Sequence, residues 1–469
     1  MLHRLLLVAL LAAPLWAQAQ SFALPPEVDA ALARAKLPRD AVTLLVADAQ
    51  GRQPPRLAWR AQVPVNPASV MKLVTTYAGL DLLGPAYAWN TPVYVAGTLR
   101  GSTLEGNVYI QGRGDPKLVV ERLWLQLRRL RGLGIQDIAG DIVLDRSAFA
   151  LPAHDPASFD GEPQKPYNAA PDALLVNFRS LVLTFTPDRA AGLARISTEP
   201  PLAGVQIPAS VALSAPGPEC GDWRGALRAE LGDPARMVFQ GVFPASCGER
   251  AWPVAYADPA SYAARAVEGL WRELGGRLGG QVREGSVPPD LLPAFSVSSP
   301  PLAEVIRDIN KYSNNVMAQQ LFLTLSLQQK GLGTFEGSRD VLRQWWRERL
   351  PDADPPVLDN GAGLSREARI SAWALARLLQ HAWQSPLMPE LVSSLPITGV
   401  DGTMRRSQAR SGTAHLKTGS LRDVAAAAGY VHATNGRRYV LVAIANHPNA
   451  AGLRPAIDAL IDWTAQLKE

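Results

Sequence analysis

At 469 residues the chain is too long for one ordinary hydrophobic core, so we expect two or three domains. A content of 47% hydrophobic and 19% charged residues is typical of a globular protein and excludes a disordered one. The net charge of +5 is small for this length, and no basic run is interleaved with aromatic residues, so no nucleic-acid partner is expected.

The N-terminal residues, MLHRLLLVALLAAPLWAQAQS, have the pattern of a secretory signal peptide. Arg4 precedes an apolar run over residues 5–16, which is too short to cross a bilayer, and AQA at 17–19 is a small-residue cleavage pattern. We therefore expect a signal peptide at 1–19 and a mature protein in the periplasm. No cysteine follows the expected cut and no other long apolar stretch predicts a transmembrane anchor. A peripheral association with the membrane or the cell wall stays open.

Residues 20–87 are expected to form the first part of a split catalytic domain. AVTLLVADAQGR, from Ala41, predicts a strand that ends at a glycine turn, and NPASVMKLVTT predicts a helix that starts at Ser69. Ser69 and Lys72 lie three positions apart, so on a helix they share a face and the amine can reach the hydroxyl. An apolar pocket or a second cation would favour the neutral amine, which can take the serine proton.

This serine–lysine pair is weak evidence by itself. At the serine and lysine frequencies of this chain, such a pair occurs by chance roughly once in every two chains of this length. A helix that starts at the serine also leaves free backbone N–H groups beside it, which suit a developing oxyanion. Other motifs must therefore support the assignment.

Residues 88–294 differ in character from the segments on either side. Short alternating segments, TPVYVAG, LEGNVYIQG, IAGDIVLD and SLVLTFTP, are separated by glycine, proline and aspartate and predict β-rich structure. We expect an inserted β-rich domain at 88–189 and 251–294, with a small proline-rich domain nested in it at 190–250.

The two cysteines of the chain, Cys220 and Cys247, both lie in this nested unit. In an oxidising compartment a structural disulfide is the simplest arrangement, and two reduced thiols are the alternative. Two thiols are too few for a thiolate metal site, and the six histidines lack a metal-binding spacing. We expect neither a metal nor another cofactor.

Residues 295–469 are expected to complete the catalytic domain. PLAEVIRDINKYSNNVMAQQLFLTL, from Pro301, places apolar residues at helical spacing around the polar break YSNN, which contains Ser313 and Asn315. A polar pair at such a break can face a cleft, and a helix surface or cap is the alternative.

Three strands and a closing helix are predicted at the C-terminus. They are AHLKTGSL, VAAAAGYVHA, RYVLVAIANH and LRPAIDALIDWTAQL, with a hairpin turn at Asn435–Gly436. The first strand contains Lys417, Thr418, Gly419 and Ser420. A glycine inside a strand can let a ligand backbone come close, so this strand suits an extended peptide that ends in a carboxylate. A plain edge strand is the alternative.

Taken together and in this order, SxxK, SxN and KTG resemble the signature set of the penicillin-interactive serine enzymes. The first two motifs lie much farther apart than the last two, unlike in a class A β-lactamase. The chain instead resembles the low-molecular-mass class C penicillin-binding proteins, the D-alanyl-D-alanine carboxypeptidase/endopeptidases of the DacB type. The likeness covers nearly the whole mature chain and includes GRGDPKL near Asp115, FDGEPQKPYNAAPDALLVNF from Phe159, DNGAGLSR ending at Arg366 and LPITGVDGT ending at Thr403. The relatives usually carry DGSGLSR in place of DNGAGLSR, but the arginine is retained.

The resemblance implies an α+β, penicillin-binding transpeptidase-like (serine β-lactamase-like) domain. Its antiparallel sheet is flanked by helices, and a long β-rich insert separates the first two motifs. The implied function is a serine DD-peptidase that acts on peptidoglycan stem peptides and that β-lactams acylate and inhibit. A β-lactamase or esterase on the same scaffold, or a non-catalytic peptidoglycan-binding or β-lactam-sensing protein, are the alternatives. The sequence leaves the oligomeric state open.

The resemblance also implies roles for the motif residues. Ser69 attacks the carbonyl of the D-Ala–D-Ala bond, Lys72 is the general base, and Ser313 relays a proton to the leaving amine. Asn315 holds Lys72 and the substrate amide, and Lys417 supplies positive potential.

Further residues contact the substrate in this interpretation. Thr418 and Ser420 donate hydroxyl hydrogen bonds beside Gly419, and the backbone N–H groups of Ser69 and Ser420 form the oxyanion hole. Thr403 is a second carboxylate contact, and Arg366 contacts the diamino-acid side chain of the stem peptide. Asp160 or Glu162 assists there, with a solvated loop charge as the alternative for both acids.

Overall fold

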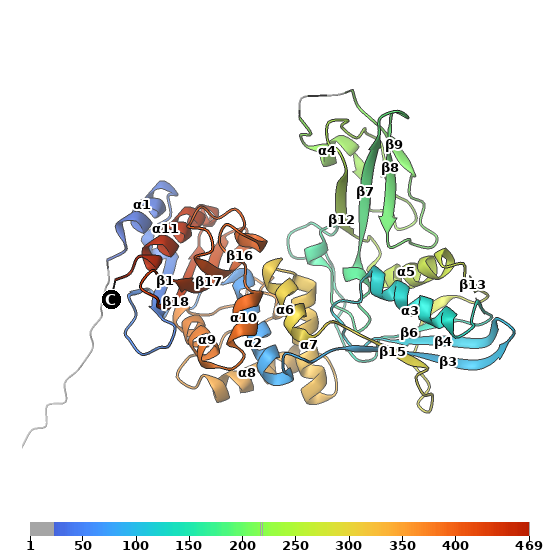
Figure 1. Ribbon diagram of the computed structural model, residues 1–469, viewed down its shortest axis with the longest axis horizontal. Helices are drawn as coiled ribbons and strands as arrows, with labels where there is room; N and C mark the ends of the chain where they lie inside the picture. The colour runs from blue at the N-terminus through green and yellow to red at the C-terminus, as the bar shows by residue number, and fades with distance from the viewer. Residues whose placement is uncertain (1–22, 216, 218, 469) are drawn as a thin grey trace, which may run out of the picture.

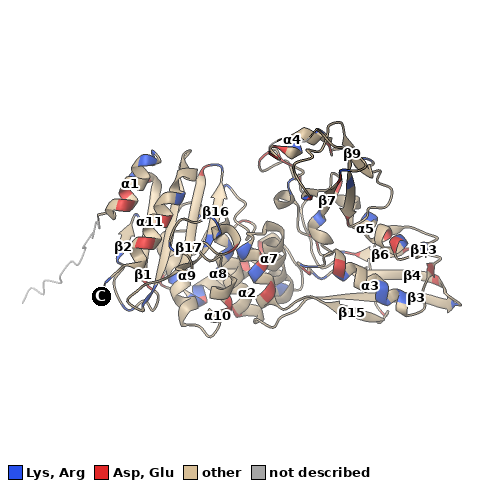
Figure 2. Cartoon of the chain, turned by 45° about the horizontal axis from the view of Figure 1, so that its top comes forward, with Lys and Arg blue, Asp and Glu red and all other residues tan. Residues whose placement is uncertain are grey.

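The computed structural model describes residues 23–468 except 216 and 218, so the signal peptide expected at 1–19 lies outside the described residues. The chain forms two bodies side by side: one from its N- and C-terminal segments, the other from its middle (Figure 1). Basic and acidic residues are interspersed over both bodies (Figure 2). Within the part of the chain that the structure describes, no helix has the length and apolar character needed to span a membrane.

The first body is built on a five-stranded antiparallel sheet. Its strands, in spatial order, are β16 (Ala414–Leu421), β17 (Val424–His432), β18 (Arg438–Asn446), β1 (Val42–Asp48) and β2 (Leu57–Trp59). β1 pairs with β18 along its whole length, so the two ends of the chain join in one sheet. The strands, the hairpin and the closing helix predicted at the C-terminus are confirmed.

Helices cover both faces of this sheet. The outer face carries α1 (Pro26–Arg34) and α11 (Arg454–Ala465). The inner face carries α2 (Lys72–Leu83), α6 (Leu302–Lys311), α7 (Asn315–Lys330), α8 (Phe335–Arg349), α9 (Ala372–Gln384) and α10 (Met388–Ser394). β17 alternates between the faces, with Ala425 and Ala427 toward α11 and Ala426 and Ala428 toward α2. The predicted antiparallel sheet flanked by helices is confirmed.

The second body contains a seven-stranded mixed sheet. Its strands are β3 (Asn90–Arg100), β4 (Thr103–Gln111), β5 (Asp137–Ile138), β6 (Ile142–Asp145), β13 (Arg277–Leu278), β14 (Val282–Glu284) and β15 (Phe295–Ser298). β15 lies at residues that we expected in the catalytic domain, yet it pairs with β3 in this sheet.

Two amphipathic helices of the insert were missed by the sequence analysis. They are α3 (Val120–Gly132) and α5 (Pro259–Glu273), which lie beside the strands of this sheet (Figure 1). α3 buries Leu123, Leu127 and Leu130, which share one helical face, against the insert core. The insert is therefore of mixed α and β structure, although strands predominate in number.

The insert also contains a separate four-stranded antiparallel sheet. It consists of β12 (Arg250–Ala255), β7 (Ser180–Asp188), β8 (Leu193–Glu199) and β9 (Ser210–Ala212), with α4 (Trp223–Leu227) and the short pair β10 (Ala229–Glu230) and β11 (Val238–Phe239) beside it. Its first and last strands in the chain, β7 and β12, extend beyond residues 190–250 and pair with each other, so they join the nested unit to its surroundings. The division of the insert into two domains stays a prediction. The expected Cys220–Cys247 disulfide is present.

The insert is joined to the catalytic domain by polar contacts on α6 and α7. Lys117 Nζ lies 2.5 Å from Asp308 Oδ2 of α6. On α7, Gln320 accepts from the backbone N of Asp172 at 2.9 Å and donates to its carbonyl at 2.8 Å, and both residues are buried. Because both hydrogen bonds of the buried Gln320 amide are made to Asp172 of the insert, this contact specifies one orientation of the two bodies.

Removing the disulfide should destabilise the insert. The bridge joins residues 27 positions apart, so replacing both cysteines by alanine frees a loop in the unfolded chain and should cost about 3 kcal/mol of unfolding free energy. Urea unfolding followed by tryptophan fluorescence measures this, because Trp223 and Trp252 pack edge to face nearby. Reduction of the unmutated protein is the control and should give the same shift. An unchanged transition would contradict the prediction.

Candidate active site

The turn that carries Ser69 is fixed by a pair of asparagines. The backbone N of Asn66 donates to Asn446 Oδ1 at 2.9 Å, and Asn446 Nδ2 donates to the Asn66 carbonyl at 2.9 Å. The side chain of Asn66 accepts from the N of Ala68 at 2.9 Å and donates to the Ser365 carbonyl at 2.8 Å. The 3₁₀ turn η2 (Ala68–Met71) that follows is therefore held against the end of β18 before α2 begins.

Lys72 is completely buried one turn after Ser69. Its Nζ lies 2.9 Å from Ser69 Oγ, 2.6 Å from Asn315 Oδ1 and 2.6 Å from the Ala362 carbonyl. All three partners are uncharged. Burial, and then the charge of Lys417, lower the pKa of Lys72 well below its usual value. The site therefore favours a neutral amine with its lone pair available to the serine hydroxyl.

The break between α6 and α7 presents Ser313 and Asn315. Ser313 has a φ of 57°, in the left-handed region that residues with a side chain rarely adopt. Asn314 then caps α7 by accepting from the backbone N of Met317 at 3.0 Å. As a result the Ser313 hydroxyl meets Lys417, and Asn315 bridges Lys72 to the insert by donating to the Tyr167 carbonyl at 3.2 Å.

Lys417 of β16 is the second fully buried lysine. Its Nζ donates to Ser313 Oγ at 2.9 Å and to the Thr418 carbonyl at 2.6 Å, and burial lowers its pKa to about 7. The two lysines thus lie on either side of the site, each bonded to one of the predicted serines.

The free edge of β16 offers backbone amides beside Ser69. The N of Leu416 donates to the Pro396 carbonyl, away from β17, so by alternation the amides of Thr418 and Ser420 point to the same edge. At Gly419 a Cβ atom would lie 2.6 Å from the Pro67 carbonyl and 3.0 Å from the Ser69 amide. Only glycine lets the strand approach this closely, which brings the Ser69 and Ser420 amides to one place.

The sequence-predicted substrate contacts lie around this centre. The hydroxyl of Thr418 donates to Thr403 Oγ1 at 2.6 Å, so the two threonines form one hydroxyl pair on the outer side of β16. Arg366 lies on the side of the insert, with its guanidinium 4.6 Å above the ring of Phe159. A cavity of about 620 Å³ is lined there by Phe159, Arg366 and further residues of both bodies.

The two acids considered for this side of the site differ in their hydrogen bonds, and a role for either of them stays a prediction. Asp160 accepts hydrogen bonds from the hydroxyl of Tyr167 at 2.9 Å and from Asn168 Nδ2 at 2.7 Å, in the loop that carries Phe159. Glu162 contributes its backbone carbonyl to Asn168.

Two contributors were missed by the sequence analysis. Asn66 orients the serine turn, and the Ala362 carbonyl is a hydrogen-bond partner of Lys72. A signal was present for the second: Gly361 and Gly363 flank Ala362, and both have positive φ. At Gly363 a Cβ atom would lie 1.9 Å from the Ala68 carbonyl, so this loop also approaches the serine turn closely.

This chain shares its sequence family and its fold with known proteins. The family model described as D-Ala-D-Ala carboxypeptidase 3 (S13) matches residues 24–467. The chain is 27% identical over 411 residues to the D-alanyl-D-alanine carboxypeptidase of Actinomadura sp. strain R39, covering 82% of this chain and 74% of the relative. It is 24% identical over 390 residues to the D-alanyl-D-alanine carboxypeptidase DacB of Haemophilus influenzae, covering 81% and 80%. The crystal structure of penicillin binding protein 4 from H. influenzae superposes with a TM-score of 0.72 at 22% identity, covering 92% of this chain and 99% of that one. The expected penicillin-binding fold is confirmed.

The two lysines predict a bell-shaped pH profile for acylation. Lys72 loses its proton first as the pH rises, because burial and, in addition, the Lys417 charge lower its pKa, and the rate rises as the neutral amine forms. The rate then falls above about pH 7 as Lys417 in turn loses its charge. The second-order rate constant of the free protein for a fluorescent penicillin, measured as a function of pH, should show the alkaline limb near pH 7 and the acid limb at lower pH.

The variant Lys417→Arg provides the control for the alkaline limb. A guanidinium stays charged over this range, so the fall above pH 7 should disappear. A rate constant of the unmutated protein that still climbs at pH 9 would contradict the assignment, whether or not the variant folds.

Proposed function

The chain belongs to the D-Ala-D-Ala carboxypeptidase 3 (S13) family and is a serine-type D-Ala-D-Ala carboxypeptidase, and on this premise we propose that Ser69 is its nucleophile. The observation that carries the proposal is the contact of 2.9 Å between Ser69 Oγ and Lys72 Nζ. Lys72 is buried, and all its hydrogen-bond partners are uncharged. An amine in this setting is a general base at neutral pH.

Acylation follows from this contact. Lys72 takes the Ser69 proton while Oγ attacks the carbonyl of the D-Ala–D-Ala bond. The negative charge that develops on the carbonyl oxygen is met by the amides of Ser69 and Ser420, which lie together because of the close approach at Gly419. Preorganised donors of this kind need no rearrangement during the reaction.

The leaving amine then needs a proton. Ser313 can pass its hydroxyl proton to the amine and take in exchange the proton that Lys72 removed from Ser69, so Lys72 is neutral again, while the bond of 2.9 Å from Lys417 orients the Ser313 hydroxyl. The C–N bond breaks and the amine departs with its carboxylate, leaving the acyl group on Ser69. Water then attacks the ester, with Lys72 again as the base, and restores the free enzyme.

The remaining predicted residues recognise the substrate in this proposal. The Thr418–Thr403 hydroxyl pair and the Lys417 charge meet the terminal carboxylate. Arg366, stacked on Phe159 at the 620 Å³ cavity, meets the diamino-acid side chain of the stem peptide, with Asp160 nearby. A site open to an extended peptide also suits D-Ala–diamino-acid cross-links, so we include endopeptidase action.

The location of the substrate sets the location of the enzyme. Peptidoglycan lies outside the cytoplasmic membrane, and we propose that the protein acts in the periplasm. The disulfide within the insert supports an oxidising compartment. β-Lactams should acylate Ser69, and the H. influenzae penicillin binding protein 4 has been solved with a β-lactam.

Ser69→Ala should abolish covalent labelling by fluorescent penicillin and the release of D-alanine from a D-Ala–D-Ala peptide. The acyl-enzyme cannot form without the hydroxyl. Ser102→Ala, in an exposed turn of the insert, is the matched control and should label at the normal rate. Normal labelling of the Ser69→Ala protein would refute the assignment. Rapid release of the label from the unmutated protein would instead indicate a β-lactamase.

Arg366→Gln should lower kcat/KM about tenfold for stem peptides whose diamino acid carries a carboxylate, because a charge-assisted hydrogen bond is lost. Peptides with lysine at that position should lose less. Arg347→Gln, on the exposed side of α8, is the matched control. Equal losses on both peptides would mean that Arg366 does not recognise the side chain.

A further inference from the structure

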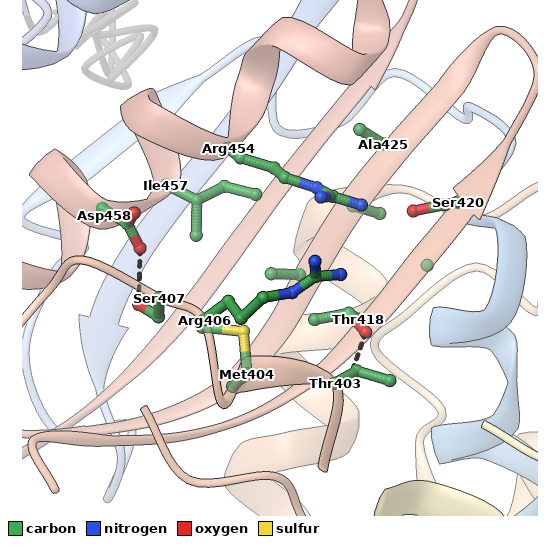
Figure 3. Close-up of a pocket in the computed structure, with 13 residues that line it drawn as sticks. Thr403, Met404, Arg406, Ser407, Thr418, Ser420, Ala425, Arg454, Ile457 and Asp458 are labelled. Carbon is green, nitrogen blue, oxygen red and sulfur yellow. Dashed lines mark hydrogen bonds between the residues drawn. The ribbon is translucent and has the colours of Figure 1, made fainter. Parts of the chain in front are cut away.

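A second cavity, of about 270 Å³, opens on the outer face of β16 (Figure 3). It is lined by Thr418, Gly419 and Ser420 of the catalytic strand and by residues of β17. Thr418 pairs with Ala427 and Ser420 with Ala425, both of which face α11, so these two hydroxyl side chains point toward the cavity rather than toward Lys417. The cavity is therefore continuous with the carboxylate-binding end of the proposed site.

Two arginines project into this cavity. Arg406 comes from the segment after Thr403 and Arg454 from the first turn of α11, and their guanidinium groups extend toward Thr418 and Ser420 (Figure 3). Among the residues that the structure describes, neither guanidinium has an ion-pair or hydrogen-bond partner, and both side chains are exposed. Two unneutralised cations beside two hydroxyl groups form an anion-binding arrangement.

The nearest acid of the cavity does not neutralise them. Asp458 lies four residues after Arg454 on α11, where an ion pair could form. Its carboxylate instead accepts from Ser407 Oγ at 2.6 Å and from the backbone N of Gln408 at 3.1 Å, turned away from the arginines (Figure 3). Asp458 thus fixes the segment after Arg406 to α11 and leaves both guanidinium groups available.

The position of Arg454 is unfavourable for the helix itself. It is the first residue of α11, where the backbone N–H groups give a partial positive charge, and no acidic residue lies in that turn. A cation there costs stability, whereas an anion bound between the two arginines would offset both charges.

We infer that Arg406 and Arg454 bind a second carboxylate of the leaving group and so favour cross-linked peptides as substrates. This inference rests on the proposed function. A released D-alanine has one carboxylate, which the Thr418–Thr403 pair and Lys417 already meet. A stem peptide released from a cross-link carries further carboxylates beyond the one next to the scissile bond. The cavity lies where such an extension would run past β16.

The test compares two substrates with the full-length enzyme. We measure kcat/KM for D-alanine release from a peptide that ends in D-Ala–D-Ala, and for conversion of cross-linked muropeptide dimers to monomers. Arg406→Gln and Arg454→Gln should each lower the dimer-to-peptide ratio of kcat/KM about tenfold, since each removes a charge-assisted hydrogen bond. Arg405→Gln, an exposed neighbour outside the cavity, is the matched control.

A stability measurement separates recognition from a structural role. The thermal midpoint of Arg454→Gln should equal or exceed that of the unmutated enzyme, because a cation leaves the helix N-terminus. A double variant whose substrate ratio stays within twofold of the unmutated value overturns the inference, as does an enzyme that releases D-alanine but leaves dimers intact. An unmutated enzyme that acts on neither substrate contradicts the proposed function instead.

Discussion

The burial of two lysine amines without a carboxylate partner is the constraint around which this structure is organised. Lys72 and Lys417 are both inaccessible to solvent. The partners of Lys72 are a hydroxyl, an amide and a carbonyl group, and those of Lys417 are a hydroxyl and a carbonyl group. An ammonium in such surroundings is costly, so at least one amine is driven toward its neutral form. A carboxylate at hydrogen-bond distance would relieve this cost and remove the base. The site therefore depends on what is kept away from Lys72 as much as on what contacts it.

This constraint explains why so many separate segments meet at one point. The partners of Lys72 come from the turn before α2, from the start of α7 and from the loop around Ala362. The last of these is held by close backbone approaches that glycine alone permits. The insert completes the enclosure, because the Tyr167 carbonyl accepts from Asn315 and so fixes the amide that bonds Lys72. The insert between the first two motifs is thus part of the surroundings of Lys72.

The sequence predicted side-chain chemistry better than backbone chemistry. Ser69, Lys72, Ser313, Asn315 and Lys417 were predicted as site residues from residue type and spacing, and the structure brings their side chains into contact. The strand at Ala414–Leu421 was predicted with its observed limits. The Ala362 carbonyl and the asparagine pair at Asn66 were not found, since a carbonyl has no residue type and the Asn66–Asn446 contact joins opposite ends of the chain. The helices of the insert were missed for another reason. α3 has clear helical periodicity, but its short flanking strands dominated the interpretation of that region.

The catalytic strand is positively charged on both of its faces, and this follows from its pleat. Lys417 points inward to Ser313, whereas its neighbour Thr418 points outward to the cavity that holds Arg406 and Arg454. Alternation along a strand places successive side chains on opposite faces. In the proposed function, β16 therefore presents the buried Lys417 to the reacting bond on one face and borders the exposed Arg406 and Arg454 on the other, where the departing group would bind. An anionic peptide bound along the edge of β16 would compensate the charge of Lys417 on one face and the charges of Arg406 and Arg454 on the other. In the proposed function these cations are the source of the affinity for the substrate, and selectivity between substrates depends on how many of them a leaving group can reach.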